Sequence, residues 1–592
     1  MPRVIRGVAA GSEEELDELT NLVWHQGMST DATTAAIPFL VETLDSPRVD
    51  RVAVLGLLAR IAVGSYHSPF QPEGDQQHAV VCAGRPVFLR LLQEDPGPEV
   101  RRAAAQTIGL LFADDPDAAG TTARLRRAAK SDPSDEVRAD AVIALGDLGV
   151  PVDGFLADPA DLVRLAAALV LVSTRADDAV VAVIEGTRPE AIPWVKSRPG
   201  VGRLPFLWLL GCVEPHWDVQ VRLVTSWLGH PDFRVRASAA HAAIAPMSAW
   251  RPAPAKLAPA LAAALSDSSE IVRFAAACSL AAAGVGPISS AADELWATVL
   301  GGGGAATWAL IALARIRDPR ADTYLAERLS GPGEADLGDL KHAVDALGSW
   351  AIACAAVIGG TIERTDDQHE RIIMLGAAGR MKSPDLLPML RREIVRQTRF
   401  AVRPVGKLGP AAAPALAELT ALRDTARDEV DRLNAAWAIW RITGDTQQLI
   451  EVARVDLENA RALDALADVE TAAADLAPSL VPLFDGSRYE SLPVPERNGI
   501  ARNAAIAYWY LTGNAEPVVP FLASQLERGQ GDLAVARCLA EIGPAAAAVL
   551  PQLRRIVADE ERTFRAMDDE TAVFHDDLFV HTCREAVARI SG

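Results

Sequence analysis

Apolar residues recur along the chain with the period of an α-helix, in short blocks separated by turns rich in proline, glycine and acids. In the first block, Ser12 and Glu15 have the spacing of a helix-capping box, and an apolar face from Leu16 to Val23 follows. This block predicts a capping helix within residues 1–34. Similar blocks continue to a last predicted helix at about residues 580–590. The pattern therefore predicts an all-α chain.

Five turns in the N-terminal half share one motif, in which a Val-Arg or Ile-Val-Arg segment follows an acid- or proline-rich turn and opens an alanine-rich helix. Successive valines of the motif are 37, 26, 72 and 37 residues apart, so the third step is about twice the first and spans one degenerate unit. Proline ends the preceding helix, and acids such as Glu136 lie where the helix dipole favours negative charge. The arginines of the motif are Arg101, Arg138, Arg164, Arg236 and Arg273.

The C-terminal half repeats on the same period. The segment that starts at Asn434 recurs 69 residues later at Asn503, and Gly409-Pro410 recurs 134 residues later as Gly543-Pro544. These offsets are close to two and four units of about 34 residues. Dividing the chain length by this period predicts about 14–16 helix pairs.

With these motifs the chain resembles HEAT repeats, particularly the short bacterial HEAT-like kind that is also seen in phycobilisome lyases. The resemblance covers most of the chain and weakens at roughly residues 175–220 and 320–400. It implies an all-α fold, a right-handed α-solenoid of stacked antiparallel helix pairs in an armadillo-like superhelix. It also implies a structural ladder, in which the Asp and Arg residues of successive motifs bond along the stack.

The repeats and their interruptions predict four regions. A capping helix occupies 1–34, and N-terminal HEAT-like repeats occupy 35–318 with a polar insertion at 64–77. Degenerate helical repeats occupy 319–404. C-terminal HEAT-like repeats occupy 405–592, with an acidic loop at 558–577 before the terminal helix.

One stretch imitates a membrane span, because residues 295–314 carry no charge. Four consecutive glycines from Gly301 interrupt it, so we expect two short buried helices joined by a glycine turn. The N-terminus has no apolar core of signal-peptide length. We therefore expect no membrane span and a cytoplasmic protein.

Composition and motifs argue against catalysis. The six cysteines include no CxxC pair, and the P-loop, HExxH and GxSxG motifs are absent from the sequence. The HEAT-like enzyme deoxyhypusine hydroxylase holds iron with four His-Glu pairs, whereas this chain has one, His369-Glu370. We expect no cofactor and no metal. The weak metal-ligand groupings, for which solvated surface residues are the favoured interpretation, are His67, His78 and Cys82, and then His575 and His581.

Charge is segregated on a chain whose formal charge is −20. Residues 188–256 carry a net +5 with five of the twelve tryptophans, and residues 391–407 carry another +5, which leaves −30 on the remainder. Such segregation can steer a complementary partner, and Trp and Arg dominate interface hot spots. The candidate partner-binding residues are Trp194, Arg198, Arg203, Trp217, Trp250, Arg392, Arg396 and Arg399.

These observations favour a non-catalytic scaffold that holds a protein partner on the solenoid surface. One alternative is a HEAT-like lyase that handles a chromophore or another ligand, which the resemblance alone motivates. A further alternative is nucleic-acid binding in a concave groove lined by Trp and Arg. The net charge of −20 opposes it, because phosphate neutralisation needs a continuous positive track.

Overall fold

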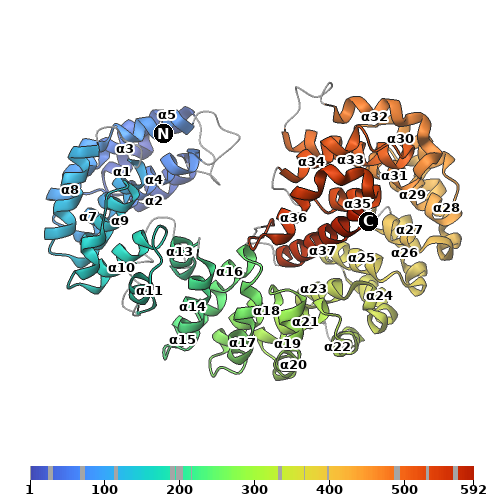
Figure 1. Ribbon diagram of the computed structural model, residues 1–592, viewed down its shortest axis with the longest axis horizontal. Coiled ribbons are helices and arrows are strands. Elements are labelled where there is room, and N and C mark those ends of the chain that lie inside the picture. Colours follow the sequence, from blue (N-terminus) through green and yellow to red (C-terminus); the bar gives the residue numbers. More distant parts are fainter. Residues whose placement is uncertain are drawn as a thin grey trace. The chain divides into compact units, whose positions relative to one another are not determined.

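The computed structural model describes residues 2–23, 31–66, 74–112, 118–186, 194, 205–214, 216–330, 337–365, 367–396, 399–485, 494–527, 532–564 and 571–592. These residues form helices joined by turns, and their only β-structure is an isolated antiparallel bridge between Trp250 and Glu561. The chain divides into two compact units, Met1–Ala242 and Ala243–Gly592. Each unit is an α-solenoid, as predicted (Figure 1).

Antiparallel helix pairs stack in two layers in the first unit. Helices α4, α7, α9 and α10 pack in sequence in one layer, and α6 packs on α8 in the other. The helices of this unit are α1 (Pro2–Ala9), α2 (Glu13–Val23), α3 (Asp31–Thr43), α4 (Arg51–Tyr66), α5 (Gly74–Cys82), α6 (Arg85–Glu94), α7 (Pro98–Leu111), α8 (Ala118–Ser131), α9 (Asp135–Asp147), α10 (Asp161–Leu171), α11 (Asp178–Glu185), α13 (Pro205–Cys212), α14 (Trp217–Leu228) and α15 (Phe233–Ala242). The predicted insertion at 64–77 lies largely outside the described residues, between α4 and α5.

The second unit has a continuous inner layer, in which each helix packs on the next, and an outer layer around it (Figure 1). The inner helices are α18 (Glu270–Ala281), α21 (Gly304–Arg315), α23 (Leu337–Leu347), α25 (Gln368–Met381), α27 (Val402–Lys407), α29 (Glu429–Thr443), α31 (Ala460–Asp468), α33 (Val494–Thr512), α35 (Leu533–Ile542) and α37 (Ala572–Ser591). The outer helices are α17 (Ala253–Ala264), α20 (Ala292–Gly301), α22 (Pro319–Ser330), α24 (Ile352–Arg364), α26 (Leu387–Val395), α28 (Leu416–Thr425), α30 (Gln447–Val455), α32 (Ala477–Phe484), α34 (Val518–Glu527) and α36 (Leu550–Ala558).

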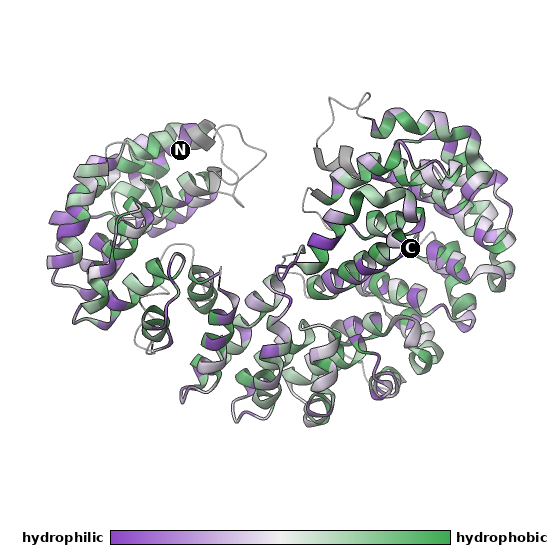
Figure 2. Cartoon of the chain, in the orientation of Figure 1, coloured by the Kyte–Doolittle hydropathy of each residue, from purple (hydrophilic) through white to green (hydrophobic). Residues whose placement is uncertain are grey.

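Small residues set the spacing between successive helices of a layer. Helices α7, α10 and α18 each contain three consecutive alanines. The middle alanine is completely buried in each, at Ala104, Ala167 and Ala276. A Cβ atom on Gly109 would lie 2.9 Å from the Ala144 Cα atom, so α7 approaches α9 more closely than an alanine would allow. Hydrophobic and hydrophilic residues alternate along the helices of both layers (Figure 2). Alanine and glycine therefore allow the close helix stacking that the repeat motif predicts.

The glycine-interrupted stretch at 295–314 forms α20 and α21, as predicted, because Gly302 and Gly303 have φ of 69° and 78°. Among the described residues, one other stretch, Leu533–Ala558, is long and apolar enough by length and composition to cross a membrane. Gly543, with φ of 67°, ends α35 within that stretch, and α36 begins at Leu550. Both α35 and α36 pack on α37.

A residue of positive φ follows most inner helices of the second unit. The positions are Gly284, Arg317, Gly348, Lys382, Gly409, Gly444, Glu470, Gly513 and Gly543. Left-handed backbone at this site ends a helix, and glycine adopts it without Cβ strain. The regular succession of repeats therefore continues through the predicted degenerate region 319–404, where Lys382 occupies one of these positive-φ positions.

The Asp that opens each of the first three turn motifs has two structural roles. One carboxylate oxygen of Asp132 accepts a hydrogen bond from the Ser134 backbone N–H at 2.9 Å and thereby closes the turn. Both oxygens also accept from Arg101 of the preceding unit, at 2.8 and 2.9 Å. Arg101 donates as well to the carbonyls of Asp95 and Pro96, in its own turn. One arginine therefore fastens two successive turns.

The resemblance implies bonds between Asp and Arg along the stack, and the structure shows such bonds for two of the predicted arginines, Arg101 and Arg138. Arg138 pairs with Asp158 of the next turn. Arg164, Arg236 and Arg273 each donate to two carbonyls of their own turn. The ladder begins one unit earlier than the motif indicates, because Arg51 binds the Asp95 carboxylate at 2.6 Å.

The start and the end of the second unit bind each other, across more than 300 residues of sequence. Arg251 donates to Asp576 at 2.9 and 3.2 Å and to the Ile556 carbonyl at 2.7 Å. Arg562 donates to the Met247 carbonyl at 3.0 Å and to Asp576 at 3.0 Å. The carboxylate of Asp576 is fully buried. We call residues 247–251 and 556–577 the clasp.

The clasp explains part of the predicted acidic loop at 558–577. Residues 559–564 pair with 249–251 through the bridge between Trp250 and Glu561, and α37 already begins at Ala572. Repeats of a solenoid ordinarily contact only their neighbours. The clasp is an exception, because it closes the second unit on itself.

Replacing Arg101 by methionine should lower the free energy of unfolding by about 3 kcal/mol, because the buried Asp132 carboxylate and two carbonyls lose their donor. The matched control is Arg90→Met, which breaks an exposed pair with Asp45 and should cost less than about 1 kcal/mol. Urea unfolding measures the cost, and hydrogen exchange of α7 and α9 localises it. Equal costs for the two variants would contradict the ladder.

Replacing Asp576 by asparagine should destabilise the second unit by about 3 kcal/mol, because Arg251 and Arg562 would share a buried site without a carboxylate. The neighbouring Asp577→Asn is the control, since the Asp577 side chain is 50% exposed and should contribute less than about 1 kcal/mol. Hydrogen exchange should show faster exchange at both 247–251 and 556–564 in the first variant. Faster exchange at only one of these segments would argue against the clasp.

Candidate functional site

The first predicted basic segment contributes to the core of the first unit at Trp194. This side chain is fully buried, and its ring meets that of Trp208 edge-on at 6.4 Å. Its carbonyl accepts a hydrogen bond from Arg102 on α7 at 3.3 Å. The prediction that Trp194 binds a partner is therefore corrected, because its side chain is in the core and its carbonyl is bonded to α7. Trp227 is also buried.

The other candidates of this segment do not form one described surface. Arg198 and Arg203 lie outside the described residues. Trp217 is half-buried at the start of α14 in the first unit, and Trp250 is half-buried in the clasp of the second unit. Trp250 therefore belongs to a structural contact. A partner-binding role for Trp217, Arg198 and Arg203 stays a prediction.

Three arginines at the start of the second predicted basic segment are paired with acids, two of them from neighbouring helices. Arg392 pairs with Glu363, and Arg396 pairs with Glu393 at 2.7 Å. Arg391, in the same segment, pairs with Glu418. Arg399 begins a short 3-10 helix (Arg399–Ala401), and its side chain lies outside the described residues. A net charge counted along the sequence missed Glu363 and Glu418 because they come from the neighbouring helices α24 and α28. Partner binding by Arg392, Arg396 and Arg399 stays a prediction.

A row of polar bonds links the inner helices of the second unit from α27 to α35. Arg403 donates to the Asn434 amide oxygen at 3.0 Å, and Trp437 donates to Asp468 at 3.1 Å. Asn503 donates to Asp464 at 2.9 Å, and Tyr510 donates to Glu541 at 2.6 Å. We call this row the inner lane, and we include in it the exposed side chains of Lys407 and Arg441.

Aromatic and cationic groups stack in the middle of the inner lane. The Arg403 guanidinium lies 4.6 Å from the centre of the Trp437 ring, and Arg441 lies 5.4 Å from that of Trp440. Such contacts hold long cationic side chains in fixed positions. The 69-residue recurrence places Asn434 and Asn503 in the same role, each binding a neighbouring inner helix. The sequence contained this signal, but periodicity alone did not show that the amides form bonds.

Cations crowd one end of the inner lane. Burial and repulsion from Arg380, Arg403 and Lys382 lower the pKa of Lys407 below its ordinary value. Burial likewise lowers the pKa of Arg403 and of Arg380. At the other end, burial and the bond to Glu541 raise the pKa of Tyr510. The lane is therefore cationic on α25 and α27 and acidic on α31, where Asp464 and Asp468 are exposed.

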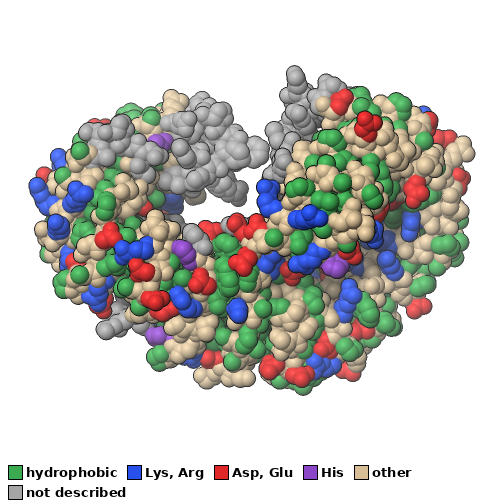
Figure 3. All heavy atoms as spheres, viewed as in Figure 1, with side chains coloured by type: hydrophobic (Ala, Val, Ile, Leu, Met, Phe, Trp, Pro, Cys, Tyr) green, Lys and Arg blue, Asp and Glu red, His purple; other side chains and the backbone are tan. Residues whose placement is uncertain are grey.

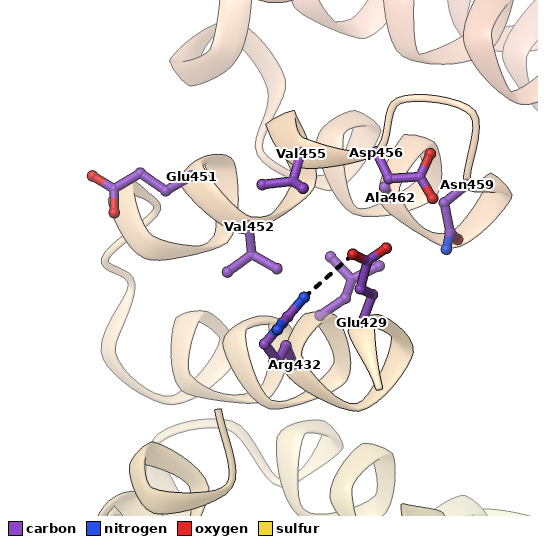
Figure 4. Close-up of a pocket in the computed structure, with 9 residues that line it drawn as sticks. Glu429, Arg432, Glu451, Val452, Val455, Asp456, Asn459 and Ala462 are labelled. Atoms are coloured by element: carbon purple, nitrogen blue, oxygen red, sulfur yellow. Dashed lines mark hydrogen bonds and ion pairs between the residues drawn. The ribbon is translucent and has the colours of Figure 1, made fainter. Parts of the chain in front are cut away.

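A small pocket lies between α29, α30 and α31, away from these bonds (Figure 4). Its volume is about 200 Å³, with an apolar lining of Leu433, Val452, Val455 and Ala462. The ion pair between Glu429 and Arg432, at 3.3 Å, lies on one side of it. The pocket holds no group of catalytic side chains.

The weak metal candidates do not converge on a site in the described residues, where no group of three or more His, Cys, Asp or Glu side chains could hold a metal ion. The Cys82 thiol donates to the Leu111 carbonyl at 3.6 Å. His575 packs on Phe564, and His581 lies 3.5 Å from Glu585. His67 lies outside the described residues, and His78 is half-buried on α5.

Basic residues also gather on the face of α36 and α37 that Figure 3 shows. The exposed residues there are Arg554, Arg555, Arg584 and Arg589. Glu585 and Asp577 lie on α37 as well and are also exposed. This surface is therefore of mixed charge, unlike the cationic end of the inner lane.

Residues 85–172 match the family model of HEAT repeats, over the part of the chain that contains the best-formed ladder. Residues 85–172 are therefore HEAT repeats, and the stacked helix pairs show that both units are α-solenoids. No curated protein sequence matches the chain. The bacterial and lyase-type part of the resemblance therefore stays an expectation.

Solved karyopherin structures show a distant likeness to the whole chain. Yeast importin-β (Kap95p) is 12% identical, with 98% of this chain and 92% of that chain covered and a TM-score of 0.47. Kap121p bound to Pho4p is 10% identical, with 99% and 78% covered and a TM-score of 0.47. Importin beta in an ammonium sulfate condition is 12% identical, with 100% and 97% covered and a TM-score of 0.40.

Lys407 should lose its proton at lower pH than an isolated lysine. Burial and the neighbouring cations disfavour its charged form, so its pKa should lie below the ordinary value of about 10.4. Reductive methylation with ¹³C-formaldehyde, followed by NMR titration, measures the pKa of each lysine side chain. Lys256, exposed on α17, is the reference. A Lys407 that titrates with or above Lys256 would show that the cations do not crowd it.

Proposed function

We propose that the protein is a non-catalytic scaffold that holds a protein partner on the inner lane of the second unit. The observation that supports this most is the lane itself. Aromatic and charged side chains are fixed there by bonds between successive inner helices, and Arg441, Asp464 and Glu541 remain exposed. Preordered side chains lose little entropy on binding, and stacked repeats typically use a concave surface for partners.

The chemistry of the lane favours a protein over a nucleic acid. Asp464 and Asp468 interrupt its positive charge one inner helix after Arg441, so a continuous phosphate backbone would meet carboxylates. The exposed Arg441 beside the half-buried Trp440 favours protein contacts, because both residue types are common in hot spots. No observation on the described residues favours the lyase alternative. A cytoplasmic location stays a prediction.

Charge reversal at Arg441 tests the proposed function. Arg441→Glu should lower recovery of a stoichiometric partner by at least about tenfold in affinity purification from the native source, because a lane cation becomes an acid. Arg427→Glu is the matched control, since Arg427 is exposed just before α29 begins and Arg441 lies near its end.

Quantitative mass spectrometry of both purifications measures the effect. Circular dichroism should show both variants folded. Equal partner recovery by the two variants, or no stoichiometric protein with the wild type, would contradict the proposed use of the lane.

A further inference from the structure

Four cations meet where α25 and α27 end: Arg380, Lys382, Arg403 and Lys407, which we call the basic rim. Gly379 lets the helices approach, because a Cβ atom there would lie 2.8 Å from the Pro404 ring. Arg380 pairs with Asp345, and Arg403 binds an amide and an indole ring rather than a carboxylate. Within the described part of the chain, Lys382 and Lys407 have no carboxylate at ion-pair distance.

Helix geometry alone does not account for this crowding. A single cation near a helix C-terminus is favourable because of the dipole. Here desolvation, together with repulsion from Arg380, Arg403 and Lys382, lowers the pKa of Lys407. Elsewhere in the chain, arginines such as Arg101 and Arg562 are saturated by acids and carbonyls. Two of the four cations of the basic rim, Lys382 and Lys407, therefore have no carboxylate partner among the described residues.

Lys382 provides an independent observation. Its φ is 53°, in the left-handed region, at the repeat position where Gly348 and Gly409 stand after the neighbouring inner helices; Arg317 and Glu470 are the other two non-glycine residues at this position among the described repeats. A side chain there is strained, whereas glycine is not. Backbone strain that the fold does not require often marks a functional residue. At this position the chain retains a lysine that adds charge to the rim.

We propose that the basic rim binds a short acidic segment of the partner protein. The proposal rests on the proposed function and names the chemistry that part of the lane recognises. Two adjacent helices span about 20 Å, which accommodates about six extended residues. A longer polyanion such as nucleic acid would extend onto α31 and meet Asp464 and Asp468. A short run of Glu or Asp fits the charge and the extent of the rim.

The test uses the full chain and fluorescein-labelled hexaglutamate, with labelled hexathymidylate as the nucleic-acid probe. The variant is Lys382→Gly with Lys407→Gln, and the control is Lys130→Gln with Lys256→Gln, two exposed lysines away from the rim. Fluorescence anisotropy at about 20 mM salt should give a dissociation constant for hexaglutamate at least about fivefold higher for the rim variant, and unchanged for the control. Lys382→Gly relieves strain, so its thermal stability should not fall.

A second readout does not depend on affinity alone. Hexaglutamate should raise the pKa of ¹³C-methylated Lys407, because a carboxylate favours its charged form, and should leave Lys256 unmoved. Equal hexaglutamate affinity for the wild type and the rim variant would overturn the proposal, as would tighter binding of hexathymidylate than of the peptide. If the rim variant still recovers the native partner while Arg441→Glu does not, the acidic-segment proposal fails and the proposed function stands.

Discussion

The carboxylate of the turn aspartate determines how the repeats stack. One oxygen of Asp132 closes its own turn, and both receive the Arg101 guanidinium of the previous unit. Because Arg101 also binds the carbonyls of its own turn, each turn is held both internally and to its neighbour. Charge-assisted bidentate bonds of this kind fix direction as well as distance. They set the register in which the alanine-rich helices α7, α9 and α10 of the first unit pack.

The clasp adds a constraint that a ladder cannot supply. Ladder bonds connect neighbours, so small changes at each step can accumulate along an open stack. In the second unit, Asp576 receives Arg251 from the beginning and Arg562 from the end, with all three groups largely buried. The unit therefore closes on itself, and its inner layer is held at both ends. A lane of side chains fixed in this way presents one arrangement to a partner.

The fold followed from the sequence because its causes are local: a proline, an acid, Val-Arg and small residues, repeated on a period. The glycine turn between α20 and α21 was predictable for the same reason. The candidate site was less predictable. Trp194 is a core residue because a distant Arg102 binds its carbonyl, and Arg392 is neutralised by Glu363 from another helix. The clasp joins segments more than 300 residues apart, which no local pattern encodes. Asn434 and Asn503 were visible as a repeat, but their bonds appear only when the inner helices are placed side by side.

The central claim is that the inner lane of the second unit holds the partner. Hydrogen exchange of the purified complex, compared with the free chain, tests it most directly, because it reports every helix in one experiment. The account predicts added protection concentrated on α25, α27, α29 and α31, with little change on the outer helices α26, α28 and α30. Protection confined to the outer helices or to the first unit would contradict it.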